Sequence, residues 1–330
     1  MTSLTGTENL ESKFFQIGLV RRIDRWLHAM PHPSVVVEIA PGQVAAARWG
    51  AGHGDLEDVV VESLPTGSVM PSTVENNITQ PDAVRAALRR VLNRIPTHGS
   101  AIAVLVPDPV VRVFILPFES LPRRADEALP LLRWRLKKSV PFDVDETVVS
   151  WMRQAARDGT LELVTAVARQ RIVREYEEIV ESAGEVSIGV LLSSTLAALP
   201  LLEERGATLL VRLSGKTLTT VIVHGANLCV YRSTDMPTDL TLLDPQVVLD
   251  EVFPAIAYYQ DNWEGPVDRV RFGGFGAREQ IFRAALAAEL KVTVGSMSEA
   301  EAVQSLGEPA QDLIRHGLDA LAGWKLNAGS

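Results

Sequence analysis

The sequence predicts an α/β protein built from two similar halves, with a small α+β subdomain inserted into the first half. A β-hairpin pattern occurs twice, at residues 35–49 and 207–223, and in each copy two apolar runs flank a turn with glycine. After each hairpin, runs typical of strands alternate with helical segments, as in α/β proteins. Residues 117–185 interrupt this order with their own helices and strands. The two hairpins therefore indicate a duplicated fold with a cleft between the copies.

The composition is that of an ordinary globular protein and predicts a cytoplasmic location. The 330 residues are 46% hydrophobic and 22% charged, enough for one large or two medium domains. A net charge of −9 argues against nucleic acid as a partner, which requires a basic surface. The single cysteine, Cys229, excludes a disulfide framework and cysteine-rich zinc sites. No apolar run approaches the ~18 residues of a membrane span, and the sequence does not begin like a signal peptide.

The N-terminal extension, residues 1–33, is predicted to be partly disordered. Residues 1–11 are polar, whereas residues 13–30 have apolar residues at roughly helical spacing together with several arginines. Two interpretations of this amphipathic helix stay open. Its mixture of aromatic and basic residues suits a membrane surface or a partner protein. The interpretation we prefer is packing on its own domain, because most amphipathic helices pack internally.

The first domain is assigned to residues 34–190. After the first hairpin, residues 58–64 are strand-like, Pro81 suits the first turn of a helix, and residues 101–106 and 110–116 read as strands. The inserted subdomain, about 117–185, contains a helix at 123–138 that Pro130 is expected to start or kink. Strands are predicted at 147–153 and 161–168, and a helix at 169–183 that ends at Gly184.

The second domain is assigned to residues 191–330 and repeats the order of the first. A strand at 227–233 follows the hairpin, and Asp244 and Pro245 begin a helix that extends to about Trp263. A strand at 267–272 leads through a glycine-rich turn into a helix at 278–290, and a short strand follows at 291–294. A last helix begins near Glu308, and its return to the first domain is left open.

Several local patterns together resemble one family. They are the step Leu121–Pro122, the step Val140–Pro141–Phe142 with acids after it, the pair Tyr258–Tyr259 in a helix, and the turn Gly273–Gly274. In this order they are similar to the PilM family of type IV pilus assembly proteins, within the actin-like ATPase superfamily, over roughly residues 35–327. The resemblance implies duplicated actin-like (ribonuclease H-like) domains. It also implies a cytoplasmic protein that is held at the inner membrane by its partners.

The resemblance further implies a nucleotide site between the two domains. Glycine turns bring backbone N–H groups to phosphates, and adjacent acids hold Mg²⁺ through water. The positions that match such a site are Glu38, Gly42, Gly215, Thr217, Gly273, Gly274 and Gly276.

Two of the matching loops depart from the pattern of active relatives, which read Asp-x-Gly. Glu38 is longer than aspartate, and Pro41 removes a backbone donor. In the second loop Arg212 stands in the place of the acid; it cannot hold Mg²⁺, but its guanidinium can occupy the place of a phosphate. We therefore expect a degenerate site without ATP hydrolysis. We assign no catalytic residue, no metal ligand and no certain cofactor, and ATP with magnesium is the one cofactor left to test.

The partner site is predicted at the end of the basic helix in the inserted subdomain. The residues are Trp134, Val140, Pro141 and Phe142. A proline and an aromatic residue at the end of a helix are often only a packed corner. The resemblance favours the alternative, a groove for an extended or turn-like peptide.

The preferred hypothesis is a cytoplasmic actin-like scaffold of a type IV pilus assembly machine. It would dock the cytoplasmic N-terminal tail of a PilN-like inner-membrane protein and contact other pilus assembly components. Membrane contact would be indirect or through residues 13–30. The alternatives are an actin-like ATPase that cycles with nucleotide, and the cytoplasmic domain of a type II secretion GspL-like protein. The lack of a predicted membrane span argues against the last alternative, unless the sequence is a fragment of a longer protein.

Overall fold

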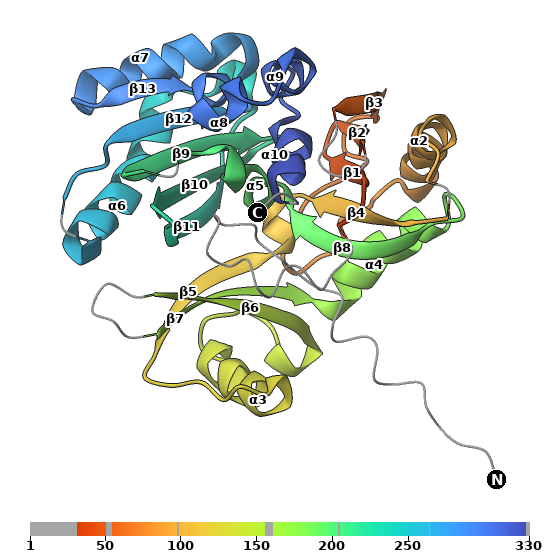
Figure 1. Cartoon of the computed structure of the whole chain (residues 1–330), viewed down its shortest axis with the longest axis horizontal. Helices are drawn as coiled ribbons and strands as arrows, with labels where there is room; N and C mark the ends of the chain where they lie inside the picture. The colour runs from red at the N-terminus through yellow and green to blue at the C-terminus, as the bar shows by residue number, and fades with distance from the viewer. Residues whose placement is uncertain are drawn as a thin grey trace.

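The computed structural model describes residues 32–50, 55–97, 99–155, 161–203, 205–263 and 265–327. Two five-stranded sheets form the centres of two large domains, and a three-stranded sheet forms a smaller subdomain beside them (Figure 1). The N-terminal helix predicted at 13–30 lies outside the described residues.

The first sheet has the strand order β3-β2-β1-β4-β8. Strands β1, β2 and β3 form an antiparallel meander, and β4 and β8 continue the sheet in parallel. The strands are β1 (Val35–Ala40), β2 (Gln43–Trp49), β3 (Leu56–Ser63), β4 (Ala101–Val106) and β8 (Ser187–Ser193). Helices α2 (Pro81–Arg94) and α4 (Gln170–Glu181) pack on one face, and α5 (Ser194–Ala198) packs on the other.

The second sheet repeats this topology with the order β11-β10-β9-β12-β13. Its first three strands again form an antiparallel meander and the last two are parallel. The strands are β9 (Ala207–Ser214), β10 (Thr217–His224), β11 (Asn227–Asp235), β12 (Arg269–Gly273) and β13 (Thr293–Ser296). Helices α6 (Pro245–Trp263) and α7 (Glu279–Glu289) cover one face, while α8 (Glu301–Gln304) and α9 (Glu308–Arg315) pack into the core on the other. The repeated strand order confirms the predicted duplication.

The small subdomain has the strand order β5-β7-β6 and is entirely antiparallel. Its strands are β5 (Arg112–Phe118), β6 (Thr147–Ala155) and β7 (Leu161–Arg169), and helix α3 (Ala125–Leu136) covers them with its own small core. The subdomain also contacts the second domain. The side-chain amide of Gln154 in β6 exchanges two buried hydrogen bonds with the backbone of Leu228 in β11, at 2.8 and 3.0 Å.

The last helix, α10 (Asp319–Asn327), lies between the two large sheets beside α5 (Figure 1). It packs on α5, β1 and β2, all in the first domain, and its residues share one hydrophobic core with α8 and α9. Trp324 stacks on His32 and donates a hydrogen bond of 3.0 Å from Nε1 to the carbonyl oxygen of Pro33. The chain thus returns to the first domain at its last helix.

Some element boundaries differ from the prediction. The sequence analysis assigns no strand at 187–193, because a short apolar run has no diagnostic period. Strand β8 spans the expected boundary between residues 190 and 191, and it pairs with β4 along its length. The small sheet begins at Arg112, and α4 packs on the first sheet rather than on the subdomain. Helix α3 begins at Ala125, so Pro130 lies inside this helix and does not start it.

Candidate functional site

The turns of the two hairpins lie in contact. Strands β1 and β2 are joined at Pro41 and Gly42, and β9 and β10 are joined at Gly215 and Lys216. Gly215 has a φ of +59°, and a Cβ atom placed on it would lie 3.0 Å from Cγ of Pro41. A phosphate therefore does not fit between Gly215 and Pro41 in this arrangement.

Strand alternation places one charged residue of each hairpin at the interface between the two domains. The odd-numbered residues of β1 pack toward α2 and α4, so Glu38 points to the opposite face. The odd-numbered residues of β9 pack toward α6 and α7, so Arg212 also points away from them. Both residues are 3% exposed, and they face each other across the domain interface, with Nη2 of Arg212 3.7 Å from Oε1 of Glu38.

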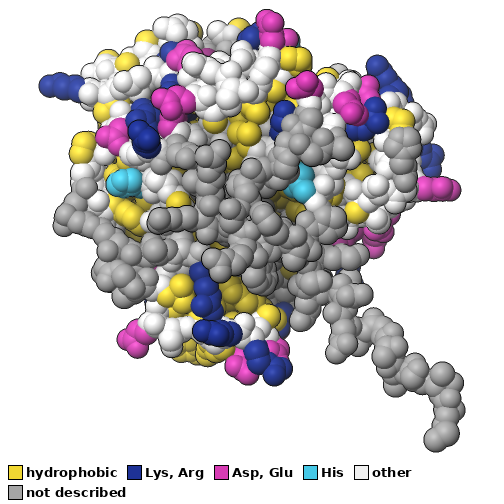
Figure 2. Space-filling view, in the orientation of Figure 1, with side chains coloured by type: hydrophobic (Ala, Val, Ile, Leu, Met, Phe, Trp, Pro, Cys, Tyr) yellow, Lys and Arg dark blue, Asp and Glu magenta, His cyan; other side chains and the backbone are white. Residues whose placement is uncertain are grey.

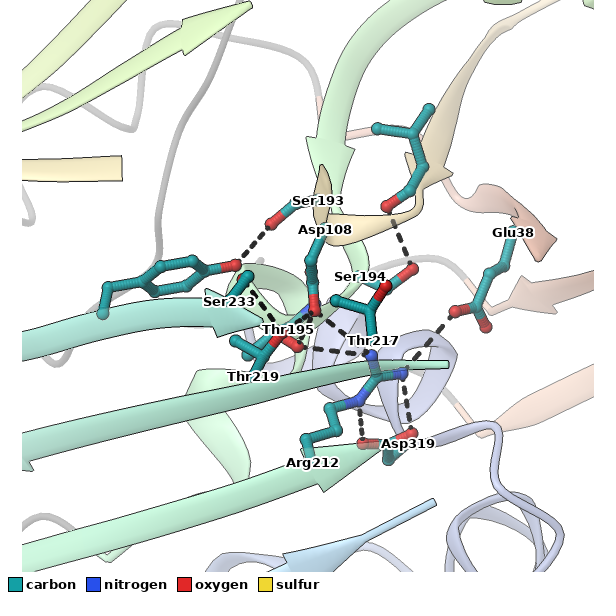
Figure 3. Close-up of polar contacts among 12 residues, drawn as sticks. Glu38, Asp108, Ser193, Ser194, Thr195, Arg212, Thr217, Thr219, Ser233 and Asp319 are labelled. Atoms are coloured by element: carbon teal, nitrogen blue, oxygen red, sulfur yellow. Dashed lines mark hydrogen bonds and ion pairs between the residues drawn. The ribbon is translucent and has the colours of Figure 1, made fainter. Parts of the chain in front are cut away.

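Arg212 is surrounded by three carboxyl groups (Figure 3). Its Nε and Nη2 atoms donate to the two carboxylate oxygens of Asp319 at 2.7 and 3.1 Å, which is a bidentate pair. Nη2 also lies 3.7 Å from Oε1 of Glu38, and Nη1 lies 3.9 Å from Oδ2 of Asp108. Nη1 donates to the hydroxyl of Thr195 at 3.3 Å. One guanidinium from β9 thus connects β1, α5 and α10 with the 3₁₀ helix Asp108–Val110.

Asp108 is held by donors from both domains. Its Oδ1 accepts a hydrogen bond of 2.9 Å from the backbone N–H of Thr195 in α5. Its Oδ2 accepts one of 2.7 Å from the hydroxyl of Thr219 in β10, and a short one from the hydroxyl of Thr195. Because these donors are protein groups, the carboxylate of Asp108 is not free to hold Mg²⁺.

The cluster is buried and carries more acids than bases. Burial raises the pKa of Glu38 to about 7, although Arg212 and the hydroxyl of Ser194 act in the opposite direction. Burial alone would lower the pKa of Arg212, but Asp319, Asp108 and Glu38 together raise it above its ordinary value. Arg212 is therefore permanently charged, and Glu38 is the group of this cluster that exchanges a proton near neutral pH.

A pocket of about 490 Å³ lies at the glycine-rich turn after β12. Gly273, Gly274 and Gly276 line it, together with polar side chains that include Glu279, Gln280, Arg283, Ser296, Ser298, Arg315, His316 and Asp319. Its size is within the range of small-molecule sites. Burial raises the pKa of Glu279, while Ser296 and Arg283 oppose this shift. The pocket has the size and the polar groups to hold a nucleoside.

Gly274 is required by packing alone. Its φ is +80°, and a Cβ atom placed on it would lie 1.9 Å from the carbonyl oxygen of Leu213 in β9. Gly276 has a φ of +49°, but a Cβ atom there would meet nothing within 4 Å. The close approach of the turn to β9 explains Gly274 without a ligand.

The predicted nucleotide residues thus fall into two groups. Gly273, Gly274 and Gly276 come together around the pocket. Glu38, Gly42, Gly215 and Thr217 lie at the two hairpins, where the turns are in contact. Thr217 donates to Oδ1 of Asp235 at 3.2 Å. Asp319 lies between the two groups, because it lines the pocket and also binds Arg212.

The four predicted partner residues do not form one surface. Val140 is buried in the core of the small subdomain, and Phe142 packs against that core with partial exposure. Pro141 is exposed. Trp134 is 74% exposed on α3, with Leu131 also exposed one turn before it. In the view of Figure 2, the region of α3 and the small sheet shows hydrophobic side chains beside lysine and arginine.

Phe142 lies at the edge of a larger groove. The Cζ atom of Arg169 is 5.8 Å from the centroid of the Phe142 ring, and Arg169 lines a hollow of about 1000 Å³. Glu146 of the small subdomain, α2 and α4 form its walls. The charged residues that line it are Arg85, Glu146, Arg169, Arg171, Arg174, Glu175 and Glu178, and its apolar residues include Ile78, Pro81 and Ile179.

The far wall of this groove is fixed by α4. Oε1 and Oε2 of Glu175 accept hydrogen bonds from the backbone of Ile78 and Asn77 at 3.0 and 2.8 Å. Arg169 donates to the carbonyl oxygen of Val74 at 3.1 Å. Arg174 is exposed and has no hydrogen-bond or ion-pair partner within the described part of the chain. The groove therefore has a wall held by hydrogen bonds and an exposed guanidinium at which a ligand could bind.

Sequence reasoning missed Asp108, Thr195, Asp319 and the groove. Asp108 and Asp319 are isolated acids whose neighbours in sequence carry no site pattern. The alternation of β9 was a usable signal, since it places Arg212 on the face opposite to Leu209, Val211 and Leu213. Within the described residues, no group of histidine, cysteine and acidic side chains is suited to hold a metal ion, and no helix has the length and apolarity to cross a membrane.

No family model and no curated protein matches the sequence. Among solved structures, a chain of the "PilM-PilN type IV pilus biogenesis complex" superposes with a TM-score of 0.74 and 17% identity. The match covers 91% of this chain and all of that one. The chain has a PilM-like, actin-like fold. This confirms the resemblance predicted from the sequence at the level of the fold.

Two further structures are similar to a smaller degree. A Bacteroides thetaiotaomicron protein with an actin-like ATPase fold and unknown function has a TM-score of 0.49 and 10% identity, over 83% of this chain and 96% of that one. The cytoplasmic domain of EpsL, an inner-membrane component of the type II secretion system of Vibrio cholerae, has a TM-score of 0.44 and 12% identity, over 72% and 80%. These scores are too low to assign more than the PilM-like fold already does.

Proposed function

We propose that this chain is a scaffold of a type IV pilus assembly machine, which docks the cytoplasmic tail of a PilN-like inner-membrane protein. The observation that supports it is the likeness, over almost the whole chain, to a structure of a PilM–PilN complex. In this proposal the protein works on the cytoplasmic side of the inner membrane, where its partners hold it. Other pilus assembly components would bind elsewhere on its surface.

The groove beside Phe142 is the docking site in this proposal. An extended tail would lie along the hollow, which has a fixed wall, apolar residues and the exposed guanidinium of Arg174. The Pro141–Phe142 corner lies beside the groove, because the ring of Phe142 is next to Arg169, which lines it. Grooves of this kind bind extended peptides through side-chain pockets and main-chain hydrogen bonds.

The first prediction concerns the docking of this tail. A fluorescent peptide with the cytoplasmic N-terminal sequence of a PilN-like protein from the same genome is expected to bind, as measured by fluorescence anisotropy. Phe142→Ala and Arg174→Glu should each weaken the affinity about tenfold or more, the usual loss at a buried contact or a paired charge. Arg174→Glu leaves the cores intact, because Arg174 is exposed.

The matched control is Trp134→Ala. Trp134 is exposed on α3 and does not line the groove. Loss of binding in this variant alone would move the docking site to the outer face of α3. Unchanged affinity in all three variants would exclude both surfaces, and thermal melting of Phe142→Ala separates lost contacts from lost folding.

The second prediction concerns ATP. The contact between the hairpin turns leaves no room for a phosphate there, and the oxygens of Asp108 and Asp319 already accept hydrogen bonds from protein groups, so both observations argue against turnover. Calorimetric titration should show that adenosine and ATP bind with similar affinity at the pocket beside Gly273, with little effect of Mg²⁺. Magnesium-dependent micromolar binding together with phosphate release would favour the alternative, a nucleotide-cycling ATPase.

A further inference from the structure

Glu38 is the least well bonded of the three acids around Arg212. Asp319 accepts two hydrogen bonds from the guanidinium, and Asp108 accepts three from Thr195 and Thr219. Oε1 of Glu38 lies 3.7 Å from Nη2 of Arg212, which is too far for a hydrogen bond. Its Oε2 is buried and has no hydrogen-bond partner within the described residues. A carboxylate in this position would carry its charge without adequate compensation.

The groups that face Glu38 come from every element packed against it. They are the guanidinium of Arg212 in β9, the carboxylate of Asp319 in α10, the carboxylate of Asp108 and the hydroxyl of Ser194 in α5. The guanidinium of Arg212, which is the cation that faces Glu38, already donates two hydrogen bonds to Asp319. If all three acids were ionised, the buried interface would carry an excess of negative charge, which is energetically costly.

Proton exchange at this position would occur near neutral pH. Burial raises the pKa of Glu38 from 4.5 to about 7, and the attraction of Arg212 does not offset it. If the hairpins separate, water reaches the carboxyl group and its pKa returns toward the ordinary value. The contact between Pro41 and Gly215 is therefore more stable when the nearby carboxyl group of Glu38 is protonated.

We propose that Glu38 is a proton-operated latch between the two domains, which holds the hairpins together when its carboxyl group is neutral and releases them when it is ionised. The stabilisation is complete below the ordinary pKa of glutamate and is lost as the pH rises through about 7. As the pH rises over this range, the ratio of closed to open molecules should fall by up to roughly 300-fold. This latch acts on the domain interface and does not depend on the docking partner or on the proposed function.

The distance between the domains tests the latch. Spin labels on Asn93→Cys in α2 and Ala288→Cys in α7 report the domain separation by pulsed electron paramagnetic resonance, since both positions are exposed. The native Cys229 is buried, and burial raises its thiol pKa, so it will not be labelled. The wild type should give one narrow distance at pH 5.5 and a shifted or broadened distribution at pH 8.5. In Glu38→Gln, which is neutral at both values, the narrow distance should persist.

Two results would overturn the latch. One is a wild-type distance that is the same at both pH values, and the other is an equal shift in Glu38→Gln. A second measurement uses the wild-type protein, so its result does not depend on whether the Glu38→Gln variant folds correctly. The ¹³C carboxyl resonance of Glu38 should titrate with a midpoint near 7, and a midpoint near 4.5 would reject the proposal.

Discussion

Replacement of Arg212 by methionine is expected to destabilise the protein by about 3–5 kcal/mol, because it leaves three buried carboxyl groups without their cation. Arg212 is 3% exposed and forms a bidentate pair with Asp319. The loss should be largest at high pH, where the remaining acids are ionised. The free energy of unfolding, measured by urea denaturation with circular dichroism at pH 6 and pH 8, checks both the size and the direction.

Arg232→Met is the matched control for this experiment. Arg232 lies in β11 of the same domain and pairs with Glu251 at 3.3 Å, but its side chain is 45% exposed. Exposed ion pairs contribute about 0–1 kcal/mol, so the control should be almost as stable as the wild type. Equal losses in the two variants would show that the buried cluster contributes no more than a surface pair.

Replacement of Gly274 by alanine is expected to destabilise the protein by about 3–5 kcal/mol, whether or not a nucleotide is present. Two effects add. The backbone has a φ of +80°, and the new Cβ atom would lie 1.9 Å from the carbonyl oxygen of Leu213, which belongs to a central strand and cannot move freely. Thermal melting and urea denaturation, each with and without ATP, measure the loss.

Two other glycines separate these effects. Gly276→Ala keeps a left-handed backbone but meets open space, so it should cost only about 1 kcal/mol. Gly42→Ala has neither problem and should change the stability by less than about 0.5 kcal/mol. If Gly274→Ala were no worse than Gly276→Ala, the turn would be able to shift away from β9.

Much of the fold can be predicted from the sequence, because it depends on local patterns of apolar and turn residues. Apolar runs on both sides of a glycine turn predict both hairpins, and the repeat of their order predicts the duplication. The inserted subdomain is visible as a break in that order, although α4 belongs to the first sheet. Strand β8 is missed because a short apolar run between a turn and a helix has no diagnostic period.

The candidate site is less accessible to such reasoning. The exchange of an acid for Arg212 in the second hairpin is visible in the sequence, and it predicts a site that does not hold Mg²⁺. Its partners are not visible, because Asp319 is 107 positions away along the chain and only the return of α10 brings it close. The structure shows the guanidinium bound to the protein's own carboxylates. The groove depends in the same way on contacts between α2, α4 and the small subdomain.

The position of α10 also determines when the first domain can mature during synthesis. All strands of the first sheet have left the ribosome once Ser193 has emerged. The face of the first domain that packs against α10 stays uncovered until α10 itself has been made. Until Trp324 reaches Pro33, a nascent chain exposes apolar side chains of β1, β2 and α5. Chaperones would therefore be expected to bind the nascent chain until α10 has been made. A chain terminated before α10 would keep these apolar side chains exposed.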